Sequence, residues 1–440
     1  MEFGTKSWEE CGLNPHLVKV CKDLSLIKPS IIQEKSIPEI LAGKGVLGLS
    51  ATGSGKTAAF ALPLLQMCSE DPYGVFCLVI TPTRELAVQI SEQLTLLGSK
   101  TKASVLTIVG GEVDKHQIDG LFAKPQFVVA TPGRLAELLR RCEDRVKRSL
   151  RLCRNIVYDE ADNLLKYPTH GGDFHPDLAT IESFCHKDHV KHFFTATMTD
   201  DLRKQLPENT TICAASETEI KLPDTLYNYY VMSVNTTHQT QKDTLLTYFL
   251  KERFDAENFP SVIIFTNRVA DAQTLGYMCK NLGFKTSILT SVDTQNSRRK
   301  NLDRFRNRNT RILVATNVAA RGLDIGKGVS LVINYDVPLN PEEFVHRVGR
   351  AARAGADGTS VTIITRQDKE RVLAIEKMIG KELESLHYFP EKAQIYTNEA
   401  IRAKQSAITD YEDDDMADKV NTALKRRSKQ HAKENIKVEH

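Results

Sequence analysis

The residues best suited to phosphate chemistry form a glycine-rich segment, residues 50–57 (SATGSGKT), which follows the apolar run Val46–Leu49. Glycines let backbone N–H groups turn toward a polyphosphate, and the N-terminus of a following helix adds partial positive charge. The Lys56 ammonium can reach the β and γ phosphates, and the Thr57 hydroxyl can ligate Mg²⁺. A flexible turn before a helix is the alternative, but the order of strand, loop, Lys-Thr and helix favours phosphate binding. The residues expected to hold the nucleotide in this segment are Thr52, Gly53, Ser54, Gly55, Lys56 and Thr57.

A second group of reactive side chains is an acidic quartet, Asp159-Glu160-Ala161-Asp162, directly after the apolar run Asn155–Tyr158. Acids at the carboxyl end of a parallel strand face the edge where a doubly wound sheet binds its ligands. Asp159 is therefore predicted to hold Mg²⁺ through water, and Glu160 to orient and deprotonate an attacking water. The quartet could instead cap a helix, but together with the phosphate segment it predicts hydrolysis of a nucleoside triphosphate.

Parallel sheets are the elements that must bring these residues together. Short β-branched runs bounded by turn residues alternate with stretches long enough for helices, which is typical of parallel sheets covered on both faces. The strands predicted for a first sheet are Val46–Leu49, Phe76–Ile80, Ser104–Val109, Phe127–Ala130, Ile156–Tyr158 and Phe193–Ala196. Those predicted for a second sheet are Val262–Phe265, Ser287–Leu289, Ile312–Ala315, Leu331–Asn334 and Ser360–Ile364. The predicted fold class is α/β.

The predicted organisation is a first domain over residues 1–215, a linker over 216–225, a second domain over 226–375 and a tail over 376–440. The linker lacks apolar periodicity and contains Pro223. In the tail, residues 410–418 hold six acids and no base, and residues 424–440 hold six Lys or Arg against two Glu. Charge blocks of this kind are typical of solvated ends, so a mobile helical and charged tail is expected.

The composition is that of an ordinary globular chain. It has 440 residues, 41% of them hydrophobic and 26% charged, and its 59 Lys and Arg against 56 Asp and Glu leave a formal charge of +3. No apolar run approaches the ~20 residues that span a bilayer, and the first ten residues lack the regions of a signal peptide. The nine cysteines form no Cys-x-x-Cys pair, so neither a disulfide framework nor a zinc ribbon is indicated. These features predict a soluble intracellular protein with no membrane association.

The remaining motifs, between about Trp8 and Thr365, occur in an order that resembles the DEAD-box RNA helicases. This resemblance implies two tandem RecA-like domains and ATP-dependent action on RNA. Residues 28–33 (KPSIIQ) resemble the adenine-sensing Q motif of that family, and the carboxamide of Gln33 therefore implies ATP rather than GTP. Trp8 stands at the upstream aromatic position expected beside the adenine. Since it is the only tryptophan, a core anchor is the other explanation for it, and both roles are compatible.

Several first-domain motifs resemble the family's RNA contacts, which place hydroxyls, a guanidinium and helix N-termini against phosphates without reading bases. Each motif alone would indicate only a turn and a helix cap; their joint order makes them specific. The first-domain residues expected to bind RNA are Pro82, Thr83, Arg84, Gly111, Thr131 and Arg134. The Thr195-Ala196-Thr197 segment resembles the motif that couples hydrolysis to strand separation. The resemblance implies coupling roles for Asp162, Thr195, Thr197 and His346.

The second half carries the complementary motifs. Residues 263–267 (IIFTN) resemble motif IV, and the helix that should contain Arg298 lies in a basic stretch with seven Lys or Arg and one Asp between residues 298 and 311. A merely solvated face is the alternative for the arginines of this stretch outside the motif. By resemblance, Arg298, Thr316 and Arg321 bind RNA, and Asp324 binds the ribose of the nucleotide. Residues 346–353 (HRVGRAAR) match motif VI, which implies that Arg350 and Arg353 are arginine fingers. With Lys56 and Glu160 these are the expected catalytic residues, so the two domains must close for catalysis.

The chain also departs from the family pattern at several positions. The departures are Ser25, Leu26, Ser50, Thr290, Asn317 and Ala351. None of them removes a group that carries hydrolysis, so they are expected to affect rate and coupling rather than the type of reaction.

Within the family, the segment Cys68–Cys77 and the short charged tail resemble the branch that serves ribosome assembly. That resemblance implies work on precursor ribosomal RNA in the nucleolus of the nucleus, with ATP and Mg²⁺ as cofactors. RNA is expected to be held by its backbone with little base specificity, and an activating protein partner is compatible with the family. Two alternatives stay open: an ATP-gated RNA clamp with little turnover, and a DNA-directed helicase. A metal site in the segment Cys185–His192 is disfavoured because that segment leads directly into a predicted strand.

Overall fold

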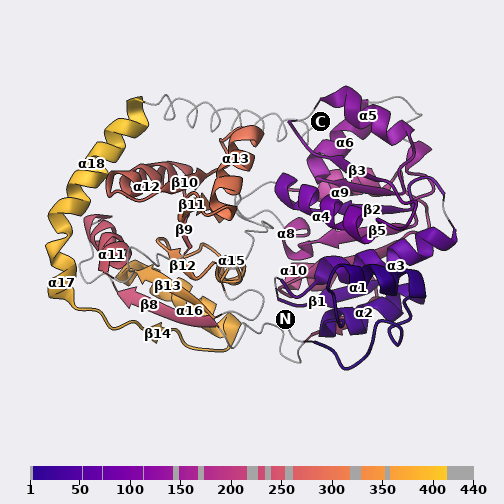
Figure 1. Ribbon diagram of the computed structural model, residues 1–440, viewed down its shortest axis with the longest axis horizontal. Coiled ribbons are helices and arrows are strands. Elements are labelled where there is room, and N and C mark those ends of the chain that lie inside the picture. The colour runs from indigo at the N-terminus through magenta and orange to yellow at the C-terminus, as the bar shows by residue number, and fades with distance from the viewer. Residues whose placement is uncertain are drawn as a thin grey trace. The chain divides into compact units, whose positions relative to one another are not determined.

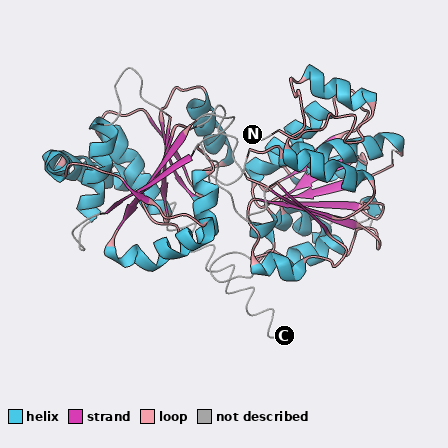
Figure 2. Cartoon of the chain, turned by 90° about the horizontal axis from the view of Figure 1, so that it is seen from below, coloured by secondary structure: helices cyan, strands magenta, loops and turns pink. Residues whose placement is uncertain are grey.

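The computed structural model describes residues 3–51, 53–71, 73–111, 113–141, 148–166, 173–215, 226–232, 239–252, 261–317, 329–351 and 357–413. These residues form two compact units, one ending at residue 215 and the other beginning at residue 226. Each unit has a seven-stranded sheet with helices on its faces (Figure 2). The predicted linker, residues 216–225, and the tail beyond residue 413 lie outside the described residues.

The first sheet is parallel throughout, in the order β3-β4-β2-β5-β6-β1-β7. Its strands are β1 (Val46–Leu49), β2 (Cys77–Ile80), β3 (Val105–Ile108), β4 (Phe127–Ala130), β5 (Asn155–Asp159), β6 (Val190–Thr195) and β7 (Thr211–Ala214). The helices of this unit are α1 (Pro15–Asp23), α2 (Ile31–Leu41), α3 (Lys56–Glu70), α4 (Arg84–Leu97), α5 (Asp114–Phe122), α6 (Pro132–Arg141), α8 (Ala161–Leu164), α9 (His175–Glu182) and α10 (Asp200–Gln205).

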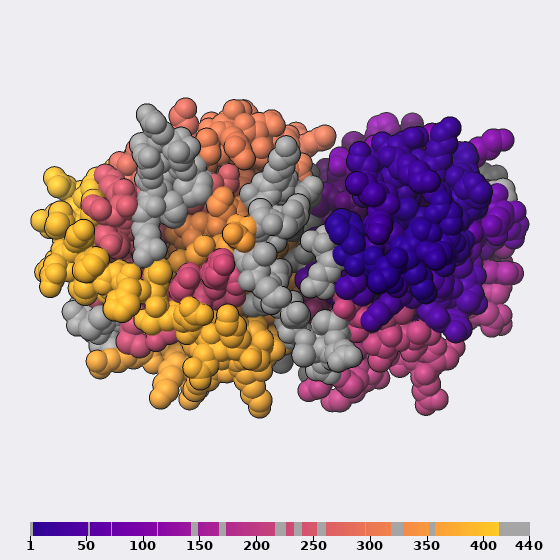
Figure 3. Space-filling view, turned by 60° about the horizontal axis from the view of Figure 1, so that its bottom comes forward, coloured from indigo at the N-terminus to yellow at the C-terminus, as the bar shows by residue number. Residues whose placement is uncertain are grey.

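Alternating side chains of these strands fill two separate cores. In β5, Val157 packs with α3 and α4 on one face, whereas Ile156 and Tyr158 pack with α6, α9 and α10 on the other. Because both faces are covered, nearly every residue of the central strands is apolar, and the period-two alternation disappears from the sequence. The residues before α3, in indigo, form one side of this unit (Figure 3).

The second sheet is also parallel, in the order β10-β11-β9-β12-β13-β8-β14. Its strands are β8 (Leu226–Met232), β9 (Val262–Thr266), β10 (Thr286–Leu289), β11 (Ile312–Thr316), β12 (Leu331–Asn334), β13 (Gly358–Ile364) and β14 (Glu384–Ser385). The helices are α11 (Gln239–Glu252), α12 (Val269–Asn281), α13 (Gln295–Arg306), α15 (Pro341–Val348), α16 (Lys369–Ile379), α17 (Pro390–Ile395) and α18 (Thr397–Asp413), with a short 3₁₀ turn at Arg366–Asp368. The predicted α/β class with two tandem parallel sheets is confirmed.

The structure differs from the predicted start of the tail at residue 376. Helix α18 packs along α11 and α12, where it lies in yellow in Figure 1, and it buries Ala400, Ala403 and Ala407 in the core of the second unit. The hydroxyl of Tyr396, just before α18, donates to Glu252 Oε1 at a distance of 2.6 Å. The core of the second unit therefore extends through α18, within the segment 376–440 that the sequence analysis assigns to a helical and charged tail.

Parallel strands bring the ends of all their loops to one edge. In the first unit, the carboxyl edge carries the segments after β1, β2, β3, β4, β5 and β6; in the second, it carries those after β9, β10, β11 and β12. These are the segments in which the sequence places its reactive residues.

Candidate functional site

The phosphate segment joins β1 to α3 through two glycines with positive φ. Gly53 has φ +79° and Gly55, the N-cap of α3, has φ +94°. A Cβ on Gly55 would lie 2.3 Å from Gln33 Nε2, so only glycine fits there. Lys56 Nζ donates to the carbonyls of Ser50 (2.6 Å) and Ala51 (3.0 Å), which holds its ammonium inside the loop. Thr52 lies outside the described residues.

Gln33 is attached to the phosphate segment. Its Oε1 accepts from Ser30 N at 2.8 Å, and its Nε2 donates to Gly55 O at 3.0 Å. The carboxamide is buried, so its orientation is fixed by these two bonds. Gln33 thus lies directly beside the loop that precedes Lys56.

Trp8 occupies the core of the first unit. Its side chain is 2% exposed, and its indole Nε1 donates to Leu26 O at 2.9 Å. Nearby, Glu34 accepts from the backbone nitrogens of Thr5 (2.6 Å) and Lys6 (3.0 Å). Trp8 therefore anchors the segment leading to Gln33, as the core-anchor explanation requires. Glu34 was not singled out in the sequence, and its pairing with a segment nearly thirty residues away leaves no local signal.

The acidic quartet ends β5 and begins α8. Glu160 has the left-handed conformation φ 52°, ψ 49°, and Asp159, Glu160 and Asp162 are all buried. Burial, followed by the charge of Glu160, raises the pKa of Asp159 to about 7, while Lys56 acts in the opposite direction. Within the described residues, Glu160 Oε2 has no hydrogen-bond partner. Buried carboxylate oxygens close to a lysine, with the Thr57 hydroxyl at the start of α3, are the hard oxygen donors that Mg²⁺ prefers.

Hydrogen bonds join the loops after β1, β5 and β6. The Thr197 hydroxyl donates to Asp162 Oδ2, and Thr195 Oγ1 accepts from Thr197 N at 3.2 Å. Ser50 N donates to Thr195 O at 3.1 Å. A shift of the acidic loop would therefore act directly on Thr197, and through Thr195 on the phosphate segment.

Arg84 and the glycines after β3 lie together. Thr83 caps α4 by accepting from Leu86 N at 3.3 Å, and Arg84 begins that helix with an exposed side chain. A Cβ added to Gly110 or Gly111 would come within 2.8 or 3.0 Å of the Arg84 guanidinium. The loops after β2 and β3 are thus brought together around one cation, with Pro82 next to Thr83.

Arg134 is engaged within the unit. Its Nη2 lies 2.6 Å from Asp114 Oδ1, its Nε donates to Gln117 Oε1 at 3.0 Å, and its side chain is largely buried. Thr131 O accepts from Leu135 N at 3.1 Å at the start of α6. Arg134 therefore ties α6 to α5, a contact that its motif does not predict.

In the second unit, Arg298 points back toward the end of β10. Its Nη1 donates to Thr290 O at 3.3 Å. The Thr290 hydroxyl, one of the departures from the family pattern, donates to Asp293 Oδ2 at 2.7 Å and accepts from Gln273 Nε2 at 3.2 Å. The Thr290 hydroxyl thus has a partner both as donor and as acceptor. Thr316, at the end of the neighbouring strand β11, is buried.

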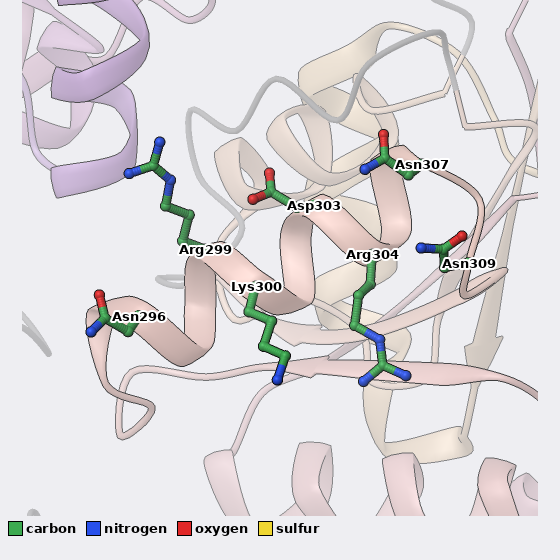
Figure 4. Close-up of a pocket in the computed structure, with 7 residues that line it drawn as sticks. All are labelled: Asn296, Arg299, Lys300, Asp303, Arg304, Asn307 and Asn309. Carbon is green, nitrogen blue, oxygen red and sulfur yellow. The ribbon is translucent and has the colours of Figure 1, made fainter.

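The outer face of α13 forms an open polar depression of about 430 Å³ (Figure 4). Lys300 and Arg304 project on the same side of the helix, as residues four apart must. The lining residues are Asn296, Arg299, Lys300, Asp303, Arg304, Asn307 and Asn309. Three cations against one acid make this face suited to a polyanion.

The motif VI helix α15 is held by a buried arginine that was not among the predicted site residues. Arg347 Nη2 donates to Asn267 Oδ1 and Nη1 donates to Asp336 O, each at a distance of 2.7 Å. Its Nε donates to Asn317 Oδ1. Arg350 Nε donates to the His346 carbonyl at 3.1 Å. Arg347 lies inside the quoted motif, so attention to its first arginine could have found it. The predicted residues Arg321, Asp324 and Arg353 lie outside the described residues.

Among the described residues, no helix is both long and apolar enough to cross a bilayer. The same part of the chain holds no group of three or more His, Cys, Asp or Glu side chains arranged to bind a metal ion.

Two family models match the chain. The DEAD/DEAH box helicase model matches residues 30–205, and the helicase conserved C-terminal domain model matches residues 240–355. Together these matches cover more than half of the chain, and they contain the loops whose geometry is given above.

Similar proteins cover nearly its whole length. It is 38% identical to the ATP-dependent RNA helicase dbp8 of Schizosaccharomyces pombe over 415 residues, which are 92% of this chain and 89% of that protein. It is also 38% identical to the ATP-dependent rRNA helicase RRP3 of Yarrowia lipolytica over 416 residues, covering 94% and 83%.

Solved structures of RNA-bound proteins share the fold of this chain. Dbp5 of S. cerevisiae bound to RNA and ADP BeF3 is 28% identical, with a TM-score of 0.75 over 90% of this chain and all of that one. Mss116p bound to ssRNA and AMP-PNP is 25% identical, with a TM-score of 0.79 over 95% and 86%. The fold, the ordered loops at the carboxyl edges and these relatives agree: the chain belongs to the DEAD-box family of ATP-dependent RNA helicases.

Proposed function

We propose that this helicase works on precursor ribosomal RNA in the nucleolus, where RNA-stimulated ATP hydrolysis separates short duplexes or displaces bound proteins. Support for the substrate comes from the relative named as an rRNA helicase, RRP3 of Yarrowia lipolytica, at 38% identity over nearly the whole chain. The observation that carries the coupled mechanism is the set of hydrogen bonds from Asp162 through Thr197 and Thr195 to Ser50.

In this proposal the first unit binds and polarises ATP. Gln33 recognises the adenine edge while holding the phosphate segment, and Lys56 exchanges its two loop carbonyls for phosphate oxygens. Thr57 and Asp159 would hold Mg²⁺, which supplies charge neutralisation on the phosphates when bound. Glu160 orients and deprotonates the attacking water, a role that suits a buried carboxylate oxygen without a hydrogen-bond partner in the described residues.

The second unit completes the site in the same proposal. Arg350 and Arg353 stabilise charge on the transferring phosphoryl group, Asp324 binds the ribose, and His346 couples the two activities. RNA is held along its backbone by the residues at the carboxyl edges of both sheets, among them Arg84, Arg298, Thr316 and Arg321. A backbone held in this way cannot keep both strands of a regular duplex, so pairing is lost locally.

The decisive experiment is steady-state ATPase activity of the full chain with single-stranded RNA, with DNA of the same sequence, and with neither. We expect RNA-selective stimulation that is lost in Glu160→Gln, whereas Glu92→Gln, an exposed substitution on α4, leaves it unchanged. Stimulation by DNA alone would contradict the proposal. Retention of RNA with ATP but without turnover would instead identify an ATP-gated clamp.

The ribosomal substrate needs a separate test. RNA crosslinked to the tagged protein in its own cells should be enriched in precursor ribosomal sequences, and the protein should be located in the nucleolus. Enrichment of messenger RNA precursors with a nucleoplasmic location would overturn this part of the proposal and leave the RNA-dependent ATPase intact.

A further inference from the structure

Helix α18 lies beyond the residues matched by either family model, yet it completes the core of the second unit. Ala400, Ala403 and Ala407 lie on its buried face, at spacings of three and four residues. Lys404 lies on that same face, and its side chain is only 17% exposed. A lysine among buried alanines needs either a path for its ammonium to water or a buried partner.

The structure provides a partner, Asp243 on α11. Lys404 Nζ lies 3.4 Å from Asp243 Oδ1, and the Asp243 side chain is 4% exposed. The same oxygen accepts from the Tyr335 hydroxyl at 2.7 Å, and Lys404 Nζ lies 6.0 Å from the centre of the Tyr335 ring. Tyr335 follows β12 directly and is completely buried. Lys404 therefore balances a buried carboxylate that fixes one end of Tyr335.

The other end of this segment is bonded to the motif VI helix. Lys242 Nζ donates to Tyr335 O at 3.0 Å and contacts Asp336 Oδ1 at 2.9 Å. Asp336 O accepts from Arg347 Nη1 at 2.7 Å, and Asp336 Oδ2 accepts from Asn267 N at 3.1 Å. Hydrogen bonds and ion pairs thus connect α18 to α15 by way of Asp243 and the Tyr335-Asp336 segment.

We propose that Lys404 is a positioning residue for ATP hydrolysis, because it holds the Tyr335-Asp336 segment and so places α15, which contains His346 and leads directly into Arg350. This inference rests on the proposed role of Arg350. The C-terminal helix is then a functional part of the second unit as well as a cover for its core.

Loss of Lys404 should be costly because Asp243 is a buried carboxylate. Burial raises the pKa of Asp243, whereas Lys404, the Tyr335 hydroxyl and Lys242 act to lower it. Cys279 on α12 also faces this group. Without Lys404 the carboxylate keeps one fewer compensating cation, so it must take up a proton or draw in water, and either change alters the acceptor of Tyr335.

The test is Lys404→Met in the full chain, with Lys404→Arg as the conservative variant and Arg402→Met, on the exposed side of α18, as the matched charge control. We expect kcat at saturating RNA to fall about tenfold in Lys404→Met, with KM for ATP and RNA affinity within about twofold. Lys404→Arg should keep most of the activity, and Arg402→Met all of it.

A double substitution separates positioning from damage to the fold. Asp243→Asn with Lys404→Met removes both charges, so it should recover most of the lost kcat. Because burial raises the pKa of Asp243, the defect of Lys404→Met should also shrink as the pH is lowered, since a protonated Asp243 needs no cation. The double variant should lack this dependence.

Unchanged kcat in folded Lys404→Met protein would overturn the inference, as would equal losses in the single and double variants. Wild-type protein and Arg350→Ala are assayed alongside. An inactive wild type, or full activity of Arg350→Ala, would identify failure of the proposed function instead.

Discussion

Asn317 illustrates how a departure from the family pattern is accommodated by two neighbouring side chains, Arg347 and Glu343. Its Oδ1 accepts from Arg347 Nε, and its Nδ2 donates to Glu343 Oε2. An aspartate at this position could accept from Arg347 as well, but it would face Glu343 as a like charge. The amide is therefore the group that suits this pair of neighbours.

Asn317→Asp should consequently loosen α15. A lost hydrogen bond and a new like-charge contact should together cost about 1–3 kcal/mol locally. Hydrogen exchange of the α15 amides in the full chain should become faster, and Glu343→Gln added to Asn317→Asp should restore slow exchange, because a glutamine can donate to the new carboxylate. Equal exchange rates in wild type and Asn317→Asp would show that the stability of α15 does not depend on the hydrogen bond between Asn317 and Glu343.

His192, on β6, is a second residue whose environment makes a measurable prediction. Both ring nitrogens are buried without a hydrogen-bond partner in the described residues, and burial lowers the pKa of His192 to about 4. The unfolded chain binds a proton at this residue near pH 6.5 while the folded chain does not. The stability of the first unit should therefore fall as the pH decreases from 6.5 toward 4.

Between pH 7 and pH 5 this residue should remove about 2 kcal/mol of the free energy of unfolding. Trp8 is the only tryptophan and lies in the first unit, so its fluorescence during urea unfolding reports that unit. The pH dependence should be smaller in His192→Phe, and it should persist in the exposed control His116→Gln. The same slope in all three proteins would assign the acid sensitivity to other groups.

Among the elements, α13 separates two kinds of cation. Arg298 is bonded to the end of β10, whereas Arg299, Lys300 and Arg304 line the outer depression. Counterion release makes phosphate contacts visible as a salt dependence of affinity, so the outer face can be distinguished from a merely solvated helix.

Replacing Arg299, Lys300 and Arg304 together by glutamine should lower the slope of log affinity for single-stranded RNA against log salt by about 2, if all three bind phosphates. A matched variant has glutamine at Lys369, Lys377 and Lys381, three exposed cations on and after α16, and so has the same net charge as the α13 variant. Equal slopes in the two variants would mean that only overall charge matters, and that the outer face is solvated.

How far the elements could be predicted depended on how each one buries its side chains. The eleven predicted strands are all present because each contains a run of neighbouring apolar residues, as in Val157 and the residues beside it. Strand β7 was not predicted, because it is a short edge strand with an exposed Ile212. Strand β8 was not predicted either, because three tyrosines make its sequence half-polar.

The candidate site follows the same logic. Motif order identified the loops, since each follows a predictable strand. Contacts made across the fold, such as Arg134 with Asp114, left no sequence signal. Helix α18 was assigned to the tail because alanines and one lysine form its buried face, and these residue types do not produce an apolar stripe.

At the scale of the whole molecule, the proposed mechanism divides one reaction between two units. Lys56, Asp159 and Glu160 lie in the first, while Arg350 lies in the second. Binding of ATP and its hydrolysis should therefore be separable by substitution in the second unit alone.

Arg350→Ala should lower RNA-stimulated kcat by at least about a hundredfold, because an arginine finger acts mainly on the transition state. Affinity for ATP, measured by equilibrium titration of a fluorescent analogue, should change by less than about threefold. Lost nucleotide affinity with unchanged kcat would place Arg350 in ground-state binding and contradict the finger role.

The position of α18 also has a consequence for biosynthesis. The ribosome makes the chain from its N-terminus, and domains generally fold as units while synthesis proceeds. All strands of the first unit have been made once residue 214 is added, whereas the core of the second waits for Ala400, Ala403 and Ala407. A nascent chain can thus acquire a folded nucleotide-binding half long before its partner half can close its core. Until α18 has been made, the apolar side of α11 and α12 that it covers stays exposed, so we expect chaperones to bind the nascent chain there.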